Sequence, residues 1–479
     1  MADVLLGQAY YLRFDPKLWE AQQPYAPLGT LYAASYLRQR GHEPALFDAM
    51  LADSVEDWSA ALARTRPRVA AIYEDSFNYL SKMCLLRMRE AALAMIDRAR
   101  AAGVPVVVSG SDATDHPEVY LRRGADAVIL GEGEVTLADL VDRMRAGLPI
   151  DDVPGVACLD DACRLQRTAS RPFIKSLDEL PWPAWDLVDI ERYRRLWLER
   201  HGHYSMNLAT TRGCPYHCNW CAKPIYGQRY ATRSPKAVVD EMAWLKREFK
   251  PDHLWIVDDV FGLKPGWVEE FAALVEEAGA RTPFRCLMRA DQVTAGVAAA
   301  LKSAGCRMLW MGAESGSQKV LDAMEKGLGV DDIRNATRLL KSAGIGVGFF
   351  LQFGYPGETW TDIEATLQLA REMEPTDIGV SVSYPLPGTR FYERVAQQLG
   401  TKQNWVDSND LSTMYQATYA PEVYRRVHRL VHHEFRARTA KRAWLHRPHH
   451  LRRAASWLYN AAALTMTRTL VRNLREEPS

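Results

Sequence analysis

Short apolar runs alternate with helix-length amphipathic segments along most of this chain, and this alternation limits the possible folds more than any other feature. Five such runs precede residue 150, at residues 4–6, 44–47, 69–73, 104–109 and 127–130. Strands that alternate with helices form parallel sheets, because each connecting helix crosses back over a face of the sheet. We therefore expect an α/β fold in which residues 1–149 form a Rossmann-like, doubly wound parallel sheet.

The alternation is interrupted and then resumes. Residues 150–203 contain four scattered prolines and no clear periodicity, which predicts a linker. Six further apolar runs follow, at residues 206–210, 254–257, 285–288, 308–312, 347–353 and 379–383. Six strand–helix units predict a partial (β/α)6 barrel over residues 204–392, with functional residues at the carboxyl ends of its strands. Residues 393–479 are expected to form a helical C-terminal extension.

Composition sets limits on the class of protein. The 479 residues are 47% hydrophobic and 25% charged, which is typical of a folded globular protein. The net charge of +1 gives no overall reason to expect nucleic-acid binding. Eight cysteines are too few for a secreted disulfide framework, and no uninterrupted apolar run reaches the length of a membrane span. We expect a cytoplasmic protein.

Three cysteines, Cys214, Cys218 and Cys221, lie within eight residues directly after the first strand of the second series. Their CxxxCxxC spacing places three thiolates on one loop, where they can bind three corners of an iron–sulfur cubane and leave the fourth iron open. A structural zinc site with His217 as the fourth ligand is the alternative, but zinc sites usually pair two CxxC units. The spacing favours an iron–sulfur cluster whose open iron binds a substrate.

This loop and the segments after it resemble the radical S-adenosylmethionine superfamily, in which a CxxxCxΦC loop on a partial (β/α)6 barrel binds a four-iron, four-sulfur cluster. Trp220 occupies the aromatic position Φ. The resemblance implies that S-adenosylmethionine is bound, with Gly312 and Glu314 of a GxESGS segment at the ribose of the nucleoside. It also implies that Asp258 holds the methionyl ammonium group and that Arg289 meets the methionyl carboxylate.

The N-terminal sheet resembles the cobalamin-binding domain of many radical S-adenosylmethionine proteins. Glycines at strand ends let the backbone approach a large flat ligand. The resemblance implies a cobalamin site that includes Gly110, Ser111, Gly131, Glu132 and Gly133. Asp112 stands where the family often has a histidine. No Asp-x-His-x-x-Gly motif occurs near the first loop, so we expect bound cobalamin to lack a protein histidine as its lower ligand. Residues 73–79 are rich in polar and aromatic side chains, and they either line the corrin face or form a plain surface loop.

Among such proteins, the sequence resembles the group of the anaerobic magnesium-protoporphyrin cyclase and the class B radical methyltransferases. The resemblance implies an enzyme that abstracts hydrogen with a deoxyadenosyl radical and methylates an unactivated carbon of a small molecule or lipid. It also implies an external electron donor such as flavodoxin or ferredoxin. Two alternatives stay open: radical oxidative or ring-forming chemistry without methyl transfer, and a non-catalytic protein that binds cobalamin and the cluster.

Residues 425–453 form a strongly basic segment, with ten Lys or Arg, six of the chain's twelve histidines and a single acid, Glu434. This composition favours either a solvated helix face or a surface for an anionic partner. Large apolar side chains lie among or just after these charges: Trp444, Leu445, Trp457, Leu458, Tyr459 and Leu464. Because helices at membrane interfaces have this composition, we expect peripheral contact with the inner membrane surface and no binding of nucleic acid.

Overall fold

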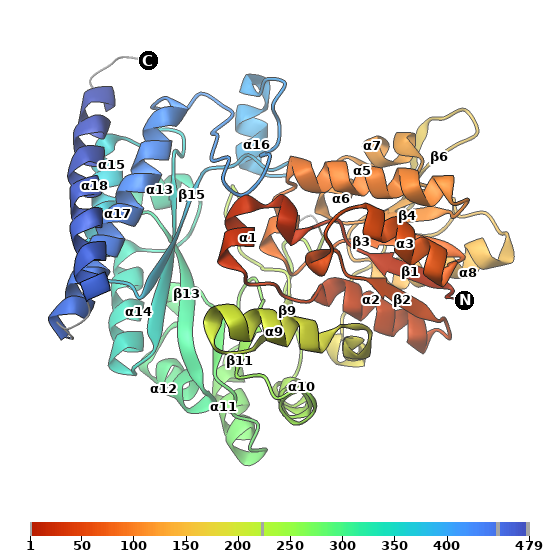
Figure 1. The fold of residues 1–479 in the computed structure, drawn as a ribbon, viewed down its shortest axis with the longest axis horizontal. Coiled ribbons are helices and arrows are strands. Elements are labelled where there is room, and N and C mark those ends of the chain that lie inside the picture. Colours follow the sequence, from red (N-terminus) through yellow and green to blue (C-terminus); the bar gives the residue numbers. More distant parts are fainter. Residues whose placement is uncertain (1, 222–224, 447–450, 476–479) are drawn as a thin grey trace.

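Two mainly parallel sheets lie side by side in this chain, with a pair of long helices at the far end of the second sheet (Figure 1). The structure is a computed structural model that describes residues 2–221, 225–446 and 451–475. Side chains are described for these residues except 442–446, 451–454 and 470–475. Among the described residues, no helix is long and apolar enough to span a membrane.

The N-terminal sheet has the strand order β2-β1-β3-β4-β5-β6-β7. Its five parallel strands are β1 (Val4–Gly7), β2 (Pro44–Phe47), β3 (Val69–Tyr73), β4 (Val106–Ser109) and β5 (Ala127–Ile129). They confirm the predicted doubly wound sheet, since the order 2-1-3-4-5 belongs to that class. The helices of this region are α1 (Pro16–Ala21), α2 (Leu28–Gln39), α3 (Glu56–Thr65), α4 (Tyr79–Lys82), α5 (Leu86–Ala101), α6 (Ser111–Asp115), α7 (Pro117–Arg123) and α8 (Glu134–Ala146).

Successive residues of β1 point into two different cores, as expected for a sheet that is covered on both faces. Val4 and Leu6 pack in a core with residues of α2 and α8. Leu5 packs in another core that contains Trp58 of α3 and Met95 of α5. All three β1 side chains are fully buried, so the carboxyl edge of the sheet is held in place from both sides.

Residues 150–203 contain regular elements that the sequence analysis did not predict. β6 (Val156–Leu159) and β7 (Leu165–Arg167) form an antiparallel hairpin that extends the N-terminal sheet. These strands have only four and three residues, too few for periodicity to reveal them. α9 (Ile190–His201) follows, and its Trp197 Nε1 donates a hydrogen bond to the carbonyl oxygen of Pro24 (2.7 Å). This segment therefore packs on the N-terminal sheet.

The second sheet has the sequential order β15-β14-β13-β12-β11-β8, and all of its strand pairs are parallel. Its strands are β8 (Ser205–Leu208), β11 (His253–Ile256), β12 (Phe284–Leu287), β13 (Cys306–Glu314), β14 (Gly346–Phe353) and β15 (Asp377–Val382). The helices are α10 (Pro235–Glu248), α11 (Trp267–Glu277), α12 (Ala295–Ala304), α13 (Gln318–Ala323), α14 (Val330–Ser342) and α15 (Trp360–Met373). This arrangement confirms the predicted partial barrel of six strand–helix units.

The C-terminal part is helical, as predicted, and it contacts both sheets. After α16 (Arg390–Val395), the chain returns to the N-terminal domain, where the carbonyl oxygen of Trp405 accepts a hydrogen bond from the Leu86 amide (2.8 Å). α17 (Pro421–His446) then packs on β15, and α18 (Leu451–Arg475) packs on α17 (Figure 1).

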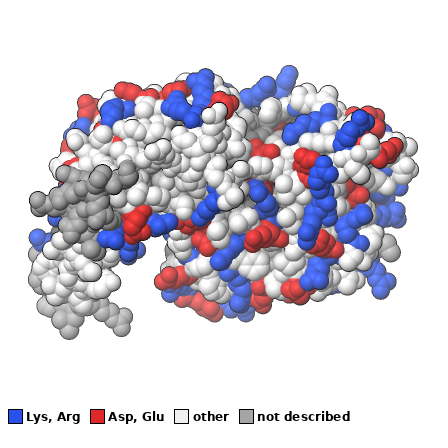
Figure 2. Space-filling model, turned by 90° about the horizontal axis from the view of Figure 1, so that it is seen from above, with Lys and Arg blue, Asp and Glu red and all other residues white. Residues whose placement is uncertain are grey.

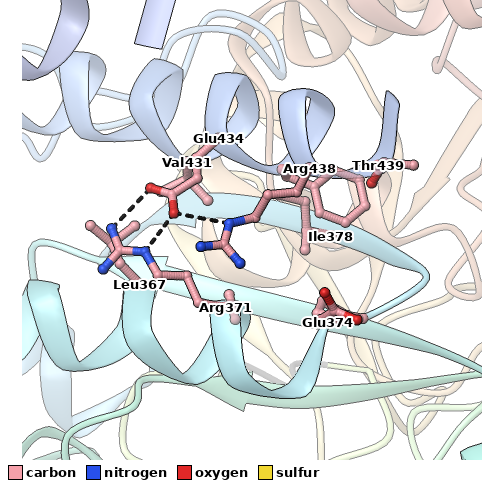
Figure 3. A pocket seen from close by; sticks show the side chains of 11 residues that line it. Leu367, Arg371, Glu374, Ile378, Val431, Glu434, Arg438 and Thr439 are labelled. Carbon is pink, nitrogen blue, oxygen red and sulfur yellow. Dashed lines mark hydrogen bonds and ion pairs between the residues drawn. The ribbon is translucent and has the colours of Figure 1, made fainter. Parts of the chain in front are cut away.

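Glu434, the single acid of the basic segment, holds this helical pair to the barrel. Figure 3 shows its carboxylate between arginines in the groove between α15 and α17. Arg371 of α15 binds it at 2.5 and 2.9 Å, and Arg468 of α18 binds it at 2.9 Å. Glu434 thus connects three helices through one buried carboxylate.

A buried arginine joins the two sheets. Arg212 lies in β9 (Thr211–Arg212), just after β8, and is 5% exposed. Its guanidinium donates to Glu132 Oε1 (2.5 Å), in the loop after β5, and to Glu134 Oε1 (2.7 Å), at the start of α8. The aromatic rings of Tyr32 and Tyr226 flank the same guanidinium, with their centroids 5.4 and 5.2 Å from its Cζ. The carboxyl ends of the two sheets therefore meet at this ion pair.

We predict that Arg212→Met destabilises the protein, because it leaves two neighbouring buried carboxylates without a cation. Loss of one partner of a buried ion pair costs about 3–5 kcal/mol. The measurement is the denaturant midpoint of unfolding. Arg38→Met is the matched control, since Arg38 makes a similar two-bond pair with Asp186 (2.7 Å) at the surface, where a loss below about 1 kcal/mol is expected. Equal midpoints for the two variants would contradict the assignment.

Candidate functional site

The three cysteines of the CxxxCxxC motif lie on a loop that is closed by a short antiparallel ribbon. β9 pairs with β10 (Ala231–Thr232), so the segment that carries the cysteines starts and ends at this ribbon, beyond the carboxyl end of β8. Gly213 has a φ of +76°, and a Cβ atom there would lie 2.4 Å from the Arg229 carbonyl oxygen. Only glycine fits this turn.

The cysteines differ in exposure: Cys214 is buried, whereas Cys218 and Cys221 are half-buried. Residues 222–224, directly after Cys221, lie outside the described residues. Among the described residues, no three His, Cys, Asp or Glu side chains surround a single ion position. The three predicted ligands lie on one loop, but the structure does not bring them around a common ion position.

Asn219 fixes this loop to the rest of the barrel. Its Nδ2 donates to the Ala323 carbonyl oxygen (2.8 Å), and its Oδ1 accepts from the hydroxyl of Tyr355 (2.8 Å). Its backbone carbonyl accepts from the Phe391 amide (2.9 Å). The side chain is only 3% exposed, so these bonds are protected from water. The contacts hold Asn219, between Cys218 and Cys221, against three other parts of the barrel.

Glu314 closes β13 beside a buried lysine that the sequence analysis did not single out. Lys326 Nζ donates to Glu314 Oε1 (2.9 Å), and both side chains are buried. A Cβ atom on Gly312 would lie 2.4 Å from the Glu314 Oε1 atom. The Glu314 carboxylate therefore occupies the space that a larger side chain at position 312 would fill. Burial lowers the pKa of Lys326, but the nearby charges of Glu314 and Cys218 raise it to a value above normal. Trp220 lies beside this pair, with its ring centroid 5.9 Å from Nζ.

Asp258 and Arg289 lie at the expected strand ends, but their polar atoms are engaged within the protein. The Asp258 carboxylate accepts hydrogen bonds from the Thr210 amide (2.7 Å), the Thr210 hydroxyl and the Thr211 amide (3.0 Å). The Arg289 guanidinium stacks on the ring of Tyr216 (3.7 Å to the centroid) and donates to the Lys326 carbonyl oxygen (3.0 Å). Both residues thus fix the cluster loop.

The carboxyl group of Glu74 is buried at the carboxyl edge of the N-terminal sheet, next to Gly110. A Cβ atom on Gly110 would lie 2.7 Å from the Glu74 side chain. Glu74 Oε1 accepts from the Ala9 amide (2.9 Å), whereas Glu74 Oε2 has no hydrogen-bond partner among the described residues. Burial raises the pKa of Glu74 to about 8. Gln8 Nε2 is also buried there without a described partner, so this edge offers polar atoms to a ligand that carries amides, as cobalamin does.

The other predicted cobalamin residues have different surroundings. Gly133 lies against Tyr73, whose hydroxyl would be 2.7 Å from a Cβ atom, and Gly131 has a φ of +82°. Ser111 is buried at the start of α6. Glu132 was predicted to contact the cofactor, but its carboxylate binds Arg212 and accepts from the Ile174 amide (2.7 Å). Both Glu132 oxygens are therefore used inside the protein.

Asp112, at the position of the family's usual histidine, is also satisfied internally. Arg89 donates to it twice (2.5 and 2.7 Å), and the Tyr120 hydroxyl donates to it as well. Its carboxylate is buried, so this ion pair is shielded from water. The position thus stabilises the junction of α5, α6 and α7.

Two segments of the chain match known families: residues 208–370 match the Radical SAM superfamily, and residues 18–141 match the B12 binding domain. An uncharacterized methyltransferase of Pyrococcus horikoshii is 27% identical over 385 residues, which are 79% of this chain and 80% of the relative. The hopanoid C-3 methylase of Methylococcus capsulatus is 28% identical over 389 residues, which are 78% and 70% of the two chains.

Among solved structures, the radical S-adenosylmethionine methyltransferase TsrM from Kitasatospora setae, with cobalamin and a 4Fe-4S cluster bound, has a similar fold. The TM-score is 0.68 at 20% identity, and the match covers 89% of this chain and 85% of that one. The cofactors implied by the two domains are a 4Fe-4S cluster, S-adenosylmethionine and cobalamin. The chain therefore carries a radical S-adenosylmethionine domain and a B12-binding domain.

Proposed function

We propose that this enzyme methylates an unactivated carbon of a small molecule or a lipid. The observation that carries the proposal is the buried contact of Arg212 with Glu132 and Glu134, because it brings the carboxyl ends of the two cofactor-binding sheets together. When bound, the reduced cluster cleaves S-adenosylmethionine to start radical chemistry, and cobalamin carries the methyl group. The protein's part is to hold these groups on either side of one substrate.

Cys214, Cys218 and Cys221 hold the cluster in this proposal, and Glu314 binds the ribose of S-adenosylmethionine. Lys326 is a positioning residue, because its ammonium group fixes the Glu314 carboxylate (2.9 Å). Asp258 was expected to hold the methionyl ammonium, but its hydrogen bonds to Thr210 and Thr211 favour a different role. We propose that it sets the start of the cluster loop.

The cobalamin site is formed by the strand ends of the N-terminal sheet, with Gly110, Ser111, Gly131 and Gly133 at its floor. Glu74 lies over Gly110 and is protonated near neutral pH, since its pKa is about 8. A neutral carboxyl group can donate a hydrogen bond without adding charge below the corrin. This supports cobalamin bound without a protein histidine.

The partners follow from this chemistry. An external electron donor such as flavodoxin or ferredoxin supplies the reducing electron, and the substrate is a small molecule or lipid. Acidic and basic side chains alternate over the face seen in Figure 2, which gives no support for a nucleic-acid groove there.

α18 presents an uncharged face that supports contact with a membrane. Asn460 and Arg468 face α17, where they contact His433 and Glu434. Leu458 and Met466 lie on the opposite side and are 61% and 67% exposed, whereas Tyr459, which is 69% exposed, lies at the edge of the helix with its ring 6.4 Å from that of His433. Helical spacing puts Ala455, Ala462, Thr465 and Thr469 on this side as well, so its described part, residues 455–469, has no charged residue. Trp444 and Leu445 belong to the predicted surface, but their side chains lie outside those described.

The charges around this face fit an anionic lipid surface. Arg425, Arg429 and Arg436 are exposed along one side of α17. In Figure 2 an uncharged area lies at the lower left, beside the undescribed C-terminal residues. An apolar helix face beside basic side chains is the pattern of interfacial binding. We propose that this surface brings the enzyme to a membrane that contains a lipid substrate or its precursor.

The first prediction tests methyl transfer. Reconstituted enzyme with methyl-labelled S-adenosylmethionine is expected to place the label in product, whereas unlabelled product would favour the oxidative or ring-forming alternative. Cys218→Ala is expected to lose both the cluster and the formation of deoxyadenosine, while Cys163→Ser, at an exposed cysteine outside the motif, keeps both. A wild-type protein that contains zinc in place of iron, or that forms no deoxyadenosine under reduction, would contradict the proposal.

The second prediction concerns Glu74 and pH. Its pKa of about 8 in the folded state exceeds the value of about 4.3 in an unfolded chain, so it contributes stability that is lost as pH rises from about 4 through 8. We expect Glu74→Gln to reduce the fall in unfolding free energy between pH 6 and pH 9 by about 2 kcal/mol. The measurement is denaturant unfolding of the apoprotein at both pH values. Parallel pH profiles for the variant and the wild type would show that Glu74 is ionised.

The third prediction tests the α18 face with the double variant Leu458→Glu, Met466→Glu. We expect its sedimentation with phosphatidylglycerol-containing vesicles to fall about tenfold or more, because two apolar side chains no longer enter the interface. Leu148→Glu is the matched control, since Leu148 is 51% exposed in the N-terminal domain. Added salt should weaken wild-type binding. Equal sedimentation of the double variant and the wild type would show that this face is only solvated.

A further inference from the structure

We propose that Tyr79, from the cobalamin-binding domain, lines the reaction cavity and faces the space where the substrate lies between the two cofactors. The inference rests on the proposed function, because it assigns a residue to the gap between the two cofactor sites. It also decides between the two interpretations of residues 73–79: this loop reaches the cavity and is not a plain surface loop.

The loop before Tyr79 is fixed to the barrel. The hydroxyl groups of Ser76 and Tyr226 are hydrogen-bonded (2.6 Å), and the ring of Phe77 packs on that of Tyr226 (5.8 Å between centroids). Tyr226 follows the cluster cysteines in the same closed loop. The loop that follows β3 therefore lies directly against the loop that carries the cluster.

The helix that starts at Tyr79 faces the barrel. Asn78 caps α4, since its side chain accepts a hydrogen bond from the Leu80 amide (3.0 Å). Lys82 Nζ binds Asp259 Oδ1 (2.6 Å), just beyond the carboxyl end of β11. Residues three apart on a helix share a side, so Tyr79 is directed toward the same end of the barrel as Lys82.

Tyr79 is accessible at the carboxyl end of the barrel. Its side chain is 61% exposed, and the ion pair of Lys82 with Asp259 holds its helix beside the end of β11. The ring therefore borders the space beyond the strand ends, where Asp258 and Glu314 also lie. Burial and the nearby charges of Cys221 and Glu314 raise the pKa of Tyr79, in agreement with this place.

The chemistry of the ring suits this place. The raised pKa keeps the phenol neutral over the working pH range, so it adds no charge beside the reacting carbon. Its flat apolar face can pack on a hydrocarbon part of a substrate, and its hydroxyl offers one donor and one acceptor. Because the side chain is 61% exposed, this hydroxyl is accessible to a bound molecule.

Cysteine footprinting tests the position of the ring. Cluster-loaded Tyr79→Cys is treated with iodoacetamide, with and without hydroxocobalamin and S-adenosylmethionine, and labelling is mapped by mass spectrometry. With both cofactors at about ten times their dissociation constants, we expect labelling at position 79 to slow about tenfold, because only the unbound fraction reacts. The native exposed Cys163 is the internal control, and its labelling should not change. A bulky maleimide should label Cys163 and not position 79.

Hydroxyl-radical footprinting of the wild type gives a second reading that needs no substitution. Tyr79 should be protected by the two cofactors, whereas Tyr459, which is 69% exposed on α18, should not. Cofactor binding is measured in the same samples. Bound cofactors without protection of position 79 would overturn this inference alone, and a failure of hydroxocobalamin to bind would overturn the proposed function as well.

Discussion

The ion pair of Arg212 with Glu132 and Glu134 is the interaction on which the arrangement of both cofactor sites depends. Arg212 precedes the first cluster cysteine by two residues, and its carboxylate partners follow β5 of the other sheet. A buried cation is tolerated only when it is fully paired, so the two domains can dock in few orientations. The same three side chains thus connect the start of the cluster loop to the carboxyl edge of the N-terminal sheet.

Around this contact, buried polar groups bind one another and hold the segments near the cluster loop in place. Asp258 fixes the Thr210–Thr211 backbone, Asn219 fixes the middle of the cluster loop, and Lys326 orients Glu314. Each of these groups is buried, and a buried group without its partner would cost more than the bond contributes. These contacts fix the segments that carry the cysteines and Glu314 to the rest of the protein.

The C-terminal extension is held to the barrel by contacts of its own. The inner half of α17 belongs to the core, since Tyr424 and Val427 are fully buried against the barrel. Glu434 then ties α15, α17 and α18 together through three arginines. This leaves Leu458 and Met466 exposed on the outer side of α18.

The sequence by itself determined both sheets and the cluster motif, because strand–helix periodicity and cysteine spacing are local signals. All five predicted N-terminal strands and all six barrel strands are present. Only the tertiary structure decided what the buried charged groups do: Glu132 binds an arginine 80 positions away, and Asp258 binds a threonine 48 positions away. The sequence pattern also did not predict the β6–β7 hairpin, because its short strands are stabilised by the sheet edge that they join. A carboxylate next to a glycine has the same local sequence whether it meets a cofactor or a distant arginine, and only the packed fold fixes its partner.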